Sequence, residues 1–161
     1  SLWFMAFGGT IPLGNVIFGP VMDAIGSRPV LYLAAAEGVA GRGSWTTAGD
    51  VRILDDSYNA NSASMSAALS VLAGSGTGTL FAVLGEMAEI DEPERAHRVV
   101  AEGAAELGIT VLAHATTMYG VPAMSLAEIV GVIRAAGPCS VLVKGSRAAR
   151  TERVVAALRE S

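Results

Sequence analysis

From residue 51 onward, four short apolar runs divide the chain, and they occupy residues 51–54, 80–84, 109–113 and 140–143. Each run is apolar almost throughout and does not alternate with polar positions, which is typical of strands that are covered on both faces. Helical patterns lie between the runs. Strands and helices that alternate at this spacing predict a parallel sheet with right-handed crossovers.

The helices between these runs have recognisable ends. Asp91 with Glu94, and Ser125 with Glu128, have the spacing of a capping box, and Gly108 marks a helix end. We expect the first helix over residues 62–72 and the last from residue 146, which gives an α/β, Rossmann-like open sheet with flanking helices. The residues expected to face the core are Val99, Val100, Ala104 and Leu107 in the second helix, Ile129, Val132 and Ile133 in the third, and Val154, Val155 and Leu158 in the last.

Residues 1–40 differ from the rest, because only Asp23, Arg28 and Glu37 are charged there. As a helix, residues 2–22 would reach roughly 32 Å, close to the hydrocarbon thickness of a bilayer. We therefore divide the chain into an apolar, transmembrane-like helical segment at 1–40, a linker rich in glycine and small polar residues at 41–50, and an α/β domain at 51–161.

Residues 19–29 (Gly-Pro-Val-Met-Asp-Ala-Ile-Gly-Ser-Arg-Pro) resemble a loop between two transmembrane helices of major facilitator superfamily transporters. Transport is not expected, because such a transporter needs many more membrane helices than this chain holds. Three readings of residues 1–40 stay open: a membrane anchor, a hydrophobic arm packed on the domain, and a fusion or gene-boundary product.

Composition narrows the range of functions. The net charge is −4, so the chain lacks the excess of basic residues that is typical of nucleic-acid-binding proteins, and nucleic acid is not an expected partner. The single cysteine, Cys139, excludes an internal disulfide, fits a reducing, cytoplasmic compartment and is expected in the core. His97 and His114 have no cysteine near them, and no metal site is expected. No Gly-x-x-x-x-Gly-Lys-Ser/Thr phosphate loop occurs in the sequence, and the glycine-rich residues 74–78 precede a strand as a connector.

Polar residues gather where three of the strands end, which is where open parallel sheets bind ligands. These segments are 55–61 (Asp-Asp-Ser-Tyr-Asn-Ala-Asn), 85–89 (Gly-Glu-Met-Ala-Glu) and 144–147 (Lys-Gly-Ser-Arg). The first suits a ribose and a base, or merely builds a turn and a helix cap. The second either orients a ligand amine through Glu86 and Glu89 or is a solvated acidic loop. The third is either an anion site or a surface cluster.

Taken together, and in this order and spacing from residue 41 to the end, the three segments resemble the C-terminal domain of the Mur ligase family. The resemblance is strongest to members that join D-alanyl-D-alanine to UDP-N-acetylmuramoyl-tripeptide in peptidoglycan synthesis, with ATP and Mg²⁺, through an acyl phosphate. It implies these substrates for the full enzyme. By position, it also implies ATP binding by Arg42, Asp56, Tyr58, Asn59 and Asn61, and substrate binding by Lys144, Ser146 and Arg147.

The sequence departs from the family pattern in several places. The family usually has Pro where Ser62 stands, Asp where Glu86 stands and Met where Thr151 stands. The UDP-substrate domain and the ATPase domain, with its phosphate loop and magnesium ligands, have no counterpart in these residues. We therefore expect no complete catalytic site and no Mg²⁺ ligands in this chain, and no activity from the chain alone. The alternative is a non-enzymatic module, either a membrane-tethered α/β binding domain or an inert fusion fragment.

Overall fold

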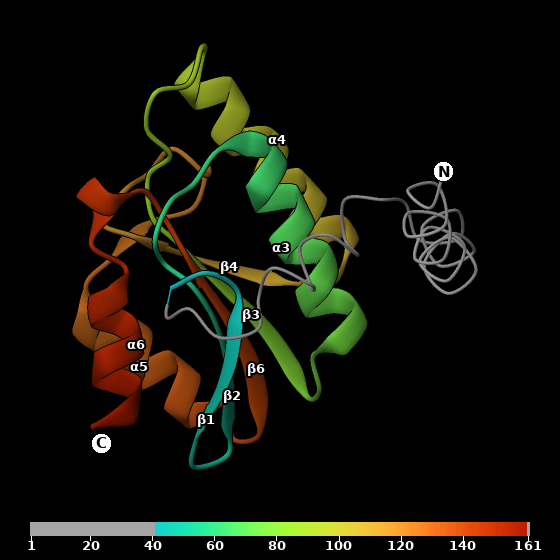
Figure 1. Ribbon diagram of the computed structural model, residues 1–161, viewed down its shortest axis with the longest axis vertical. Helices are drawn as coiled ribbons and strands as arrows, with labels where there is room; N and C mark the ends of the chain where they lie inside the picture. Colours follow the sequence, from blue (N-terminus) through green and yellow to red (C-terminus); the bar gives the residue numbers. More distant parts are fainter. Residues whose placement is uncertain (1–40, 161) are drawn as a thin grey trace, which may run out of the picture.

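The computed structural model describes residues 41–160, which form one sheet between two layers of helices (Figure 1). The strands lie in the order β1-β2-β6-β3-β4-β5, with β1 antiparallel to β2 and all other pairs parallel. The predicted open, mainly parallel α/β sheet is confirmed. The elements are β1 (Ser44–Ala48), β2 (Val51–Asp56), α3 (Ser62–Ser75), β3 (Thr79–Leu84), α4 (Pro93–Glu106), β4 (Thr110–His114), β5 (Ala123–Met124), α5 (Leu126–Ala135), β6 (Cys139–Lys144), η1 (Arg147–Ala149) and α6 (Glu152–Arg159).

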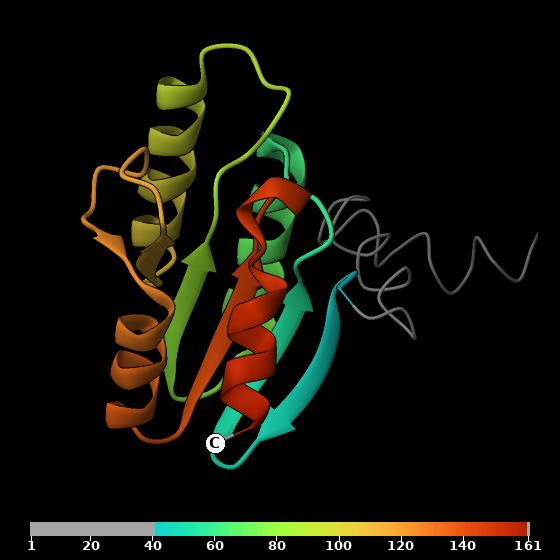
Figure 2. The same ribbon diagram turned by 90° about the vertical axis from the view of Figure 1, so that its left-hand side faces the viewer.

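Each face of the sheet is covered by a pair of helices. Helices α3 and α4 pack together on one face, and α5 and α6 pack together on the other (Figures 1 and 2). Successive strand residues alternate between the two cores: Leu54 and Leu142 face α3 and α4, whereas Ile53 and Val141 face α5 and α6. Because both faces of the four inner strands β2, β6, β3 and β4 are covered, neither side of these strands is polar along its length, and this explains the continuous apolar runs in the sequence.

The parallel strands bring their carboxyl ends to one edge of the sheet, as their arrowheads show in Figure 2. Strand β6 lies between β2 and β3, and its last residue, Lys144, is in register with Asp56 on one side and Leu84 on the other. The three polar segments that follow β2, β3 and β6 therefore meet at this edge.

The sequence prediction is wrong at both edge strands. Residues 44–48, assigned to a linker, form β1, which pairs along its length with β2. An edge strand needs backbone partners on one side only, so a short polar and small sequence suffices. The Trp45 ring also lies 4.5 Å from the Arg52 guanidinium carbon. The two-residue strand β5 has no sequence signature and was not predicted.

Two of the predicted helix starts are wrong, and the others agree with the structure. The capping box of Ser125 and Glu128 is confirmed at α5. The predicted box at Asp91 is wrong, because α4 begins at Pro93 after Glu92, whose left-handed backbone carries no side-chain cap bond. A single helix from residue 146 is also wrong, because the 3₁₀ turn η1 precedes α6.

The predicted core is largely confirmed, and Cys139 lies in it at 2% exposure. Three residues were wrongly expected inside: Val99, Leu107 and Val132 are 56%, 41% and 39% exposed. Val99 and Val132 lie toward the solvent side of helices whose buried stripe is narrower than the apolar pattern suggested, and Leu107 is the C-cap residue just after α4. The other predicted core residues, Val100, Ala104, Ile129, Ile133, Val154, Val155 and Leu158, are buried.

The predicted transmembrane-like helix at 1–40 and its transporter-like loop lie outside the described residues. Across residues 41–160, none of the helices has the length and apolarity that a bilayer-spanning helix needs.

Candidate functional site

The turn after β2 is held largely by hydrogen bonds of its own side chains. The Asp55 carboxylate oxygen Oδ1 accepts hydrogen bonds from the Ser57 hydroxyl at 2.7 Å and from the Ser57 backbone N–H at 3.3 Å. Asn61 is the N-cap of α3, where its side chain accepts a hydrogen bond from the backbone N–H of Ser64. Turn building and helix capping therefore account for Asp55 and Asn61. The Tyr58 ring, 43% exposed, is presented to solvent by this turn.

A buried ion pair joins the end of β6 to this turn. Lys144 is 2% exposed, and its ammonium group donates to the carboxylate of Asp56 and, at 2.8 Å, to the backbone carbonyl of Asn59. Burial lowers the pKa of Lys144, and the negative charge of Asp56 opposes this shift. A buried ammonium group is tolerated only when it is paired in this way. Lys144, expected to contact substrate, is thus directed at Asp56.

Six of the predicted site residues share one cavity of about 300 Å³, the α3-side cavity. It contains all five residues that were expected to bind ATP, together with Lys144. Its lining residues are Arg42, Asp56, Tyr58, Asn59, Asn61, Ser64 and Lys144.

The Tyr58 ring, which lines this cavity, lies close to two arginines. The guanidinium carbons of Arg42 and Arg147 lie 4.4 and 5.2 Å from the centroid of its ring. The chain entering the domain is also tied to the turn, because the Tyr58 N–H donates to the Gly41 carbonyl at 2.9 Å. Gly41 has a φ of +78°, a left-handed conformation that favours glycine. Arg42 is therefore fixed beside the ring.

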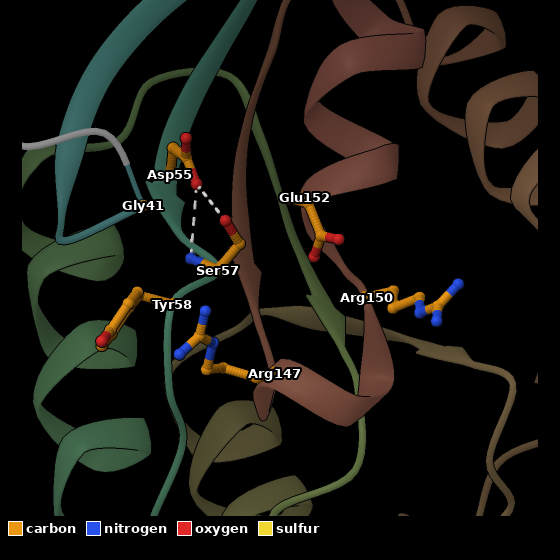
Figure 3. A pocket seen from close by; sticks show the side chains of 7 residues that line it. All are labelled: Gly41, Asp55, Ser57, Tyr58, Arg147, Arg150 and Glu152. Carbon is orange, nitrogen blue, oxygen red and sulfur yellow. Dashed lines mark hydrogen bonds between the residues drawn. The ribbon is translucent and has the colours of Figure 1, made fainter.

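A second cavity, of about 430 Å³, is also lined by Tyr58 and is called the α6-side cavity (Figure 3). Arg147 points toward Tyr58, whereas the Arg150 guanidinium points away from it. The Glu152 carboxylate projects from the start of α6 between Ser57 and Arg150. Sequence reasoning identified Arg147 but missed Arg150 and Glu152, because no motif marks them. The lining residues are Gly41, Asp55, Ser57, Tyr58, Arg147, Arg150 and Glu152.

A third cavity, of about 310 Å³, is lined by Ser146 and by four alanines, and it is called the alanine-lined cavity. The three residues expected to bind substrate, Lys144, Ser146 and Arg147, thus line three different cavities. Burial lowers the pKa of His114, and a hydrogen bond with the Met124 backbone opposes this shift. The lining residues are Glu86, Met87, Ala88, His114, Ala115, Ser146, Ala148 and Ala149.

The described part of the chain offers no group of three His, Cys, Asp or Glu side chains that could hold a metal ion. The thiol of Cys139 lies in the core, where burial raises its pKa.

Comparison with known proteins identifies the family. Residues 41–161 match the family described as "Mur ligase, glutamate ligase domain". The chain belongs to the Mur ligase family. The family resemblance predicted from the three polar segments is confirmed, and the match begins at residue 41, so it includes β1.

Similar proteins include ligases of one kind. The chain is 37% identical over 123 residues to the UDP-N-acetylmuramoyl-tripeptide–D-alanyl-D-alanine ligase of Escherichia coli (strain K12), covering 68% of this chain and 27% of the relative. Its structure resembles that of a MurF ligase from Thermotoga maritima in complex with ADP, with a TM-score of 0.66 and 26% identity over 88% of this chain and 36% of that one. MurF from Acinetobacter baumannii gives a TM-score of 0.67 and 28% identity over 78% of this chain and 32% of that one. The chain therefore spans only 27–36% of the length of these relatives.

Proposed function

We propose that residues 41–161 are the C-terminal, closing domain of a cytoplasmic ATP-dependent ligase of peptidoglycan synthesis. The enzyme would add D-alanyl-D-alanine to UDP-N-acetylmuramoyl-tripeptide. The observation that carries this proposal is the α3-side cavity, which collects the five residues that the family resemblance assigns to ATP. The ligase activity for which the Escherichia coli relative is named and the ADP complex of the Thermotoga maritima relative support it.

The side chains of the α3-side cavity suit the nucleoside part of ATP. The exposed Tyr58 ring offers a stacking face, which is favourable for any base. Asn59 offers an amide that both donates and accepts hydrogen bonds. A carboxylate accepts about four hydrogen bonds, so the pairing of Asp56 with Lys144 is compatible with a ribose hydroxyl as a further donor. Arg42 adds positive charge for the phosphates.

The residues at the end of β6 and in the turn after it have different proposed roles. Lys144 acts through Asp56, which it orients from 88 residues away along the chain. Ser146 and Arg147 face the two cavities beyond the nucleotide residues, where the incoming dipeptide would lie. ATP with Mg²⁺ would activate the tripeptide carboxylate, and none of the contacts proposed for residues 41–160 is to the metal.

A direct test uses the whole 161-residue chain and ADP. We expect ADP to bind weakly and to shift the backbone amide signals of residues 56–61 in NMR spectra. Arg42→Ala and Tyr58→Ala should weaken this response, whereas Arg95→Ala, an exposed arginine on α4, should leave it unchanged. ADP shifts that avoid residues 42 and 56–61 would rule out the assigned nucleotide site.

A chimera tests the activity. Residues 41–161 would replace the matching segment of the Escherichia coli relative, and phosphate release would be measured with ATP, UDP-N-acetylmuramoyl-tripeptide and D-alanyl-D-alanine. We expect release that depends on the dipeptide, and none from the 161-residue chain alone. A folded chimera that binds the UDP substrate but releases no phosphate would contradict the proposal.

A further inference from the structure

A fourth cavity, of about 320 Å³, lies on the side of the domain that α3 and α4 cover, and is called the α3–α4 cavity. It shares no lining residue with the other three cavities. One of its walls is Val99, which at 56% exposure is the most exposed large apolar residue in the part of the chain that the structure describes. An apolar side chain could therefore be buried here against Val99. The lining residues are Ser62, Asp91, Glu92, Arg95, Ala96 and Val99.

Helix α3 extends this surface with an exposed face that carries no charge. The 14 residues of α3 include no Asp, Glu, Lys or Arg. Exposed residues of α3 three or four positions apart share one side of the helix, and the first of them also lines the α3–α4 cavity. We call this side the α3 face, and its members are Ser62, Ala63, Ser66, Ser70 and Gly74.

The neighbouring helix α4 shows what an exposed helix of this domain otherwise looks like. The two helices pack side by side on the same face of the sheet (Figure 1). Charged residues on an exposed helix favour the helical state and pair with one another. The absence of such residues from the α3 face is typical of a helix side that another segment covers. The charged and exposed residues of α4 are Glu94, Arg95, Arg98, Glu102 and Glu106.

The hydroxyl groups of the α3 face are turned back onto the helix itself. Ser66 Oγ donates to the Ser62 carbonyl at 3.1 Å, and Ser70 Oγ donates to the Ser66 carbonyl at 3.0 Å. Covering the face would therefore leave neither O–H group without a partner. At Gly74 a side chain would meet nothing within 4 Å, so no described neighbour requires a glycine in this helix. Small residues of this kind let a second segment approach the helix closely.

The segment that suits this surface belongs to the same chain. Residues 2–22 contain no charged residue. The described residues begin beside α3, because the Gly41 carbonyl accepts from the N–H of Tyr58, three residues before the N-cap Asn61. Residues 23–40 would span roughly 60 Å when extended, whereas α3 is about 21 Å long. The uncharged residues can therefore reach every part of the α3 face.

A tethered segment is favoured over a second copy of the chain and over a lipid surface. The tether gives an effective concentration on the order of millimolar, so a weak contact suffices. A contact between two α3 faces would bury roughly 200–300 Å² on each chain, far less than the roughly 800 Å² per partner of stable interfaces. Asp91 and Glu92, which line the α3–α4 cavity, would be repelled by anionic lipids.

We propose that the uncharged residues 2–22 cover the α3 face of their own chain and place an apolar side chain in the α3–α4 cavity, against Val99. Of the three interpretations of residues 1–40, this one selects the hydrophobic arm packed on the domain. The inference is independent of the proposed function, because the α3 face shares no residue with the cavities assigned to nucleotide and substrate.

The rate of cysteine alkylation in the whole 161-residue chain tests this proposal. The single native cysteine, Cys139, is 2% exposed, so an engineered thiol is the one that reacts. Iodoacetamide should modify Ser70→Cys about tenfold more slowly than Ala105→Cys, since a cover that is favoured tenfold leaves about one tenth of the molecules open. Ala105 is a matched control, because it is an exposed small residue on α4.

Charges placed in the arm should release the cover. Leu13→Lys together with Phe18→Lys, added to Ser70→Cys, should raise the alkylation rate to that of Ala105→Cys, because a charge is unfavourable in a covered apolar contact. Ser27→Lys, which lies beyond the uncharged run and beside Arg28, should leave the rate low.

A charge on the α3 face gives a second, independent measurement. Ser66→Lys should speed chymotrypsin cleavage after Phe18 about tenfold, whereas Ala105→Lys should leave cleavage unchanged. A circular dichroism spectrum equal to that of the wild type identifies the variants that have kept their fold, so that unfolding is not taken for release of the arm.

Four results would overturn the inference. The first is equal alkylation of Ser70→Cys and Ala105→Cys. The second is slow alkylation that the two lysines in the arm leave unchanged. The third is protection that increases with protein concentration, which indicates a second copy of the chain. The fourth is protection that requires vesicles of phosphatidylcholine and phosphatidylglycerol, which indicates a lipid surface.

Discussion

The α3-side cavity and the alanine-lined cavity lie on opposite sides of the end of β6, and they are made rigid by different means. The first depends on charged side chains, because Lys144 is paired with Asp56, and Arg42 lies against Tyr58. The second depends on backbone groups, which two neutral side chains, His97 and Tyr119, hold in place. A buried charge pair is costly to break on one side only, whereas a neutral hydrogen bond is worth less. The two cavities should therefore tolerate substitution differently.

The largest effect is expected from Asp56→Asn. The variant leaves the buried Lys144 ammonium group without its counter-charge, so the free energy of unfolding should fall by about 3–5 kcal/mol. Urea denaturation measures this change, and Asp50→Asn, at an exposed position, is the control. The double variant Asp56→Leu with Lys144→Met should regain much of the loss, because removing both charges avoids burying one alone. A cost below about 1 kcal/mol for the single variant would show that charge pairing does not fix this cavity.

A smaller effect is expected from His97→Phe. The aromatic ring is kept against Tyr119, but the Met87 N–H loses its acceptor, and a buried donor without a partner costs about 1–3 kcal/mol. Hydrogen exchange should accelerate most at Met87. Arg98→Ala, an exposed change on the same helix, should stay within about 0.5 kcal/mol of the wild type. Unchanged exchange at Met87 would show that His97 does not hold this backbone group.

Tyr119→Phe should cost about 0.5–1.5 kcal/mol at neutral pH, because it removes one hydrogen bond to Gly85. The folded-state pKa of Tyr119 is raised above its unfolded value, near 10, mainly by burial. Its stabilising contribution is therefore complete below about pH 10 and is lost as the pH rises toward the folded pKa. Urea denaturation at pH 7 and pH 11 should show the wild type losing more stability than the Y119F variant. An equal loss of stability between pH 7 and pH 11 in the wild type and in the Y119F variant would contradict this account.

The smallest effect on stability is expected from Tyr58→Leu. The ring is 43% exposed and its contacts are with exposed arginines, so the change should cost less than about 1 kcal/mol. ADP affinity should nevertheless fall about tenfold, since stacking on a base is worth about 1–3 kcal/mol. Calorimetric titration with ADP measures the loss of affinity, and urea denaturation of the same variant measures the loss of stability. A large loss of stability with unchanged ADP affinity would assign Tyr58 to the fold.

The interior of the fold was predictable because local sequence determines it. Strands β2, β3, β4 and β6 were visible as apolar runs, since both faces of each are buried. Strand β1 was not, because backbone pairing with β2 holds it at the edge and its side chains carry little pattern. The sequence did not indicate the burial of Thr151 either. This residue is fully buried with no partner for its hydroxyl, at a position where the family usually has Met.

The candidate site was predictable as a set of residues, but not as a shape. The motifs grouped Asp56, Tyr58 and Asn59, which are neighbours in sequence and line one cavity. They did not predict the burial of Lys144, because its partner lies 88 residues away and a lysine is normally exposed. Nor did they separate Ser146 from Arg147, since the direction of each side chain depends on the turn into η1.

The segment 144–147 serves three cavities with almost consecutive residues, and this has a consequence for how the protein can evolve. Lys144, Ser146 and Arg147 each line a different cavity, so inserting or deleting one residue would exchange their surroundings all at once. Gly145 cannot absorb such a change, because a side chain there would meet Thr151 at 2.8 Å and the Gly85 backbone at 3.1 Å. Length variation among descendants should therefore accumulate at the opposite end of the sheet and spare this turn.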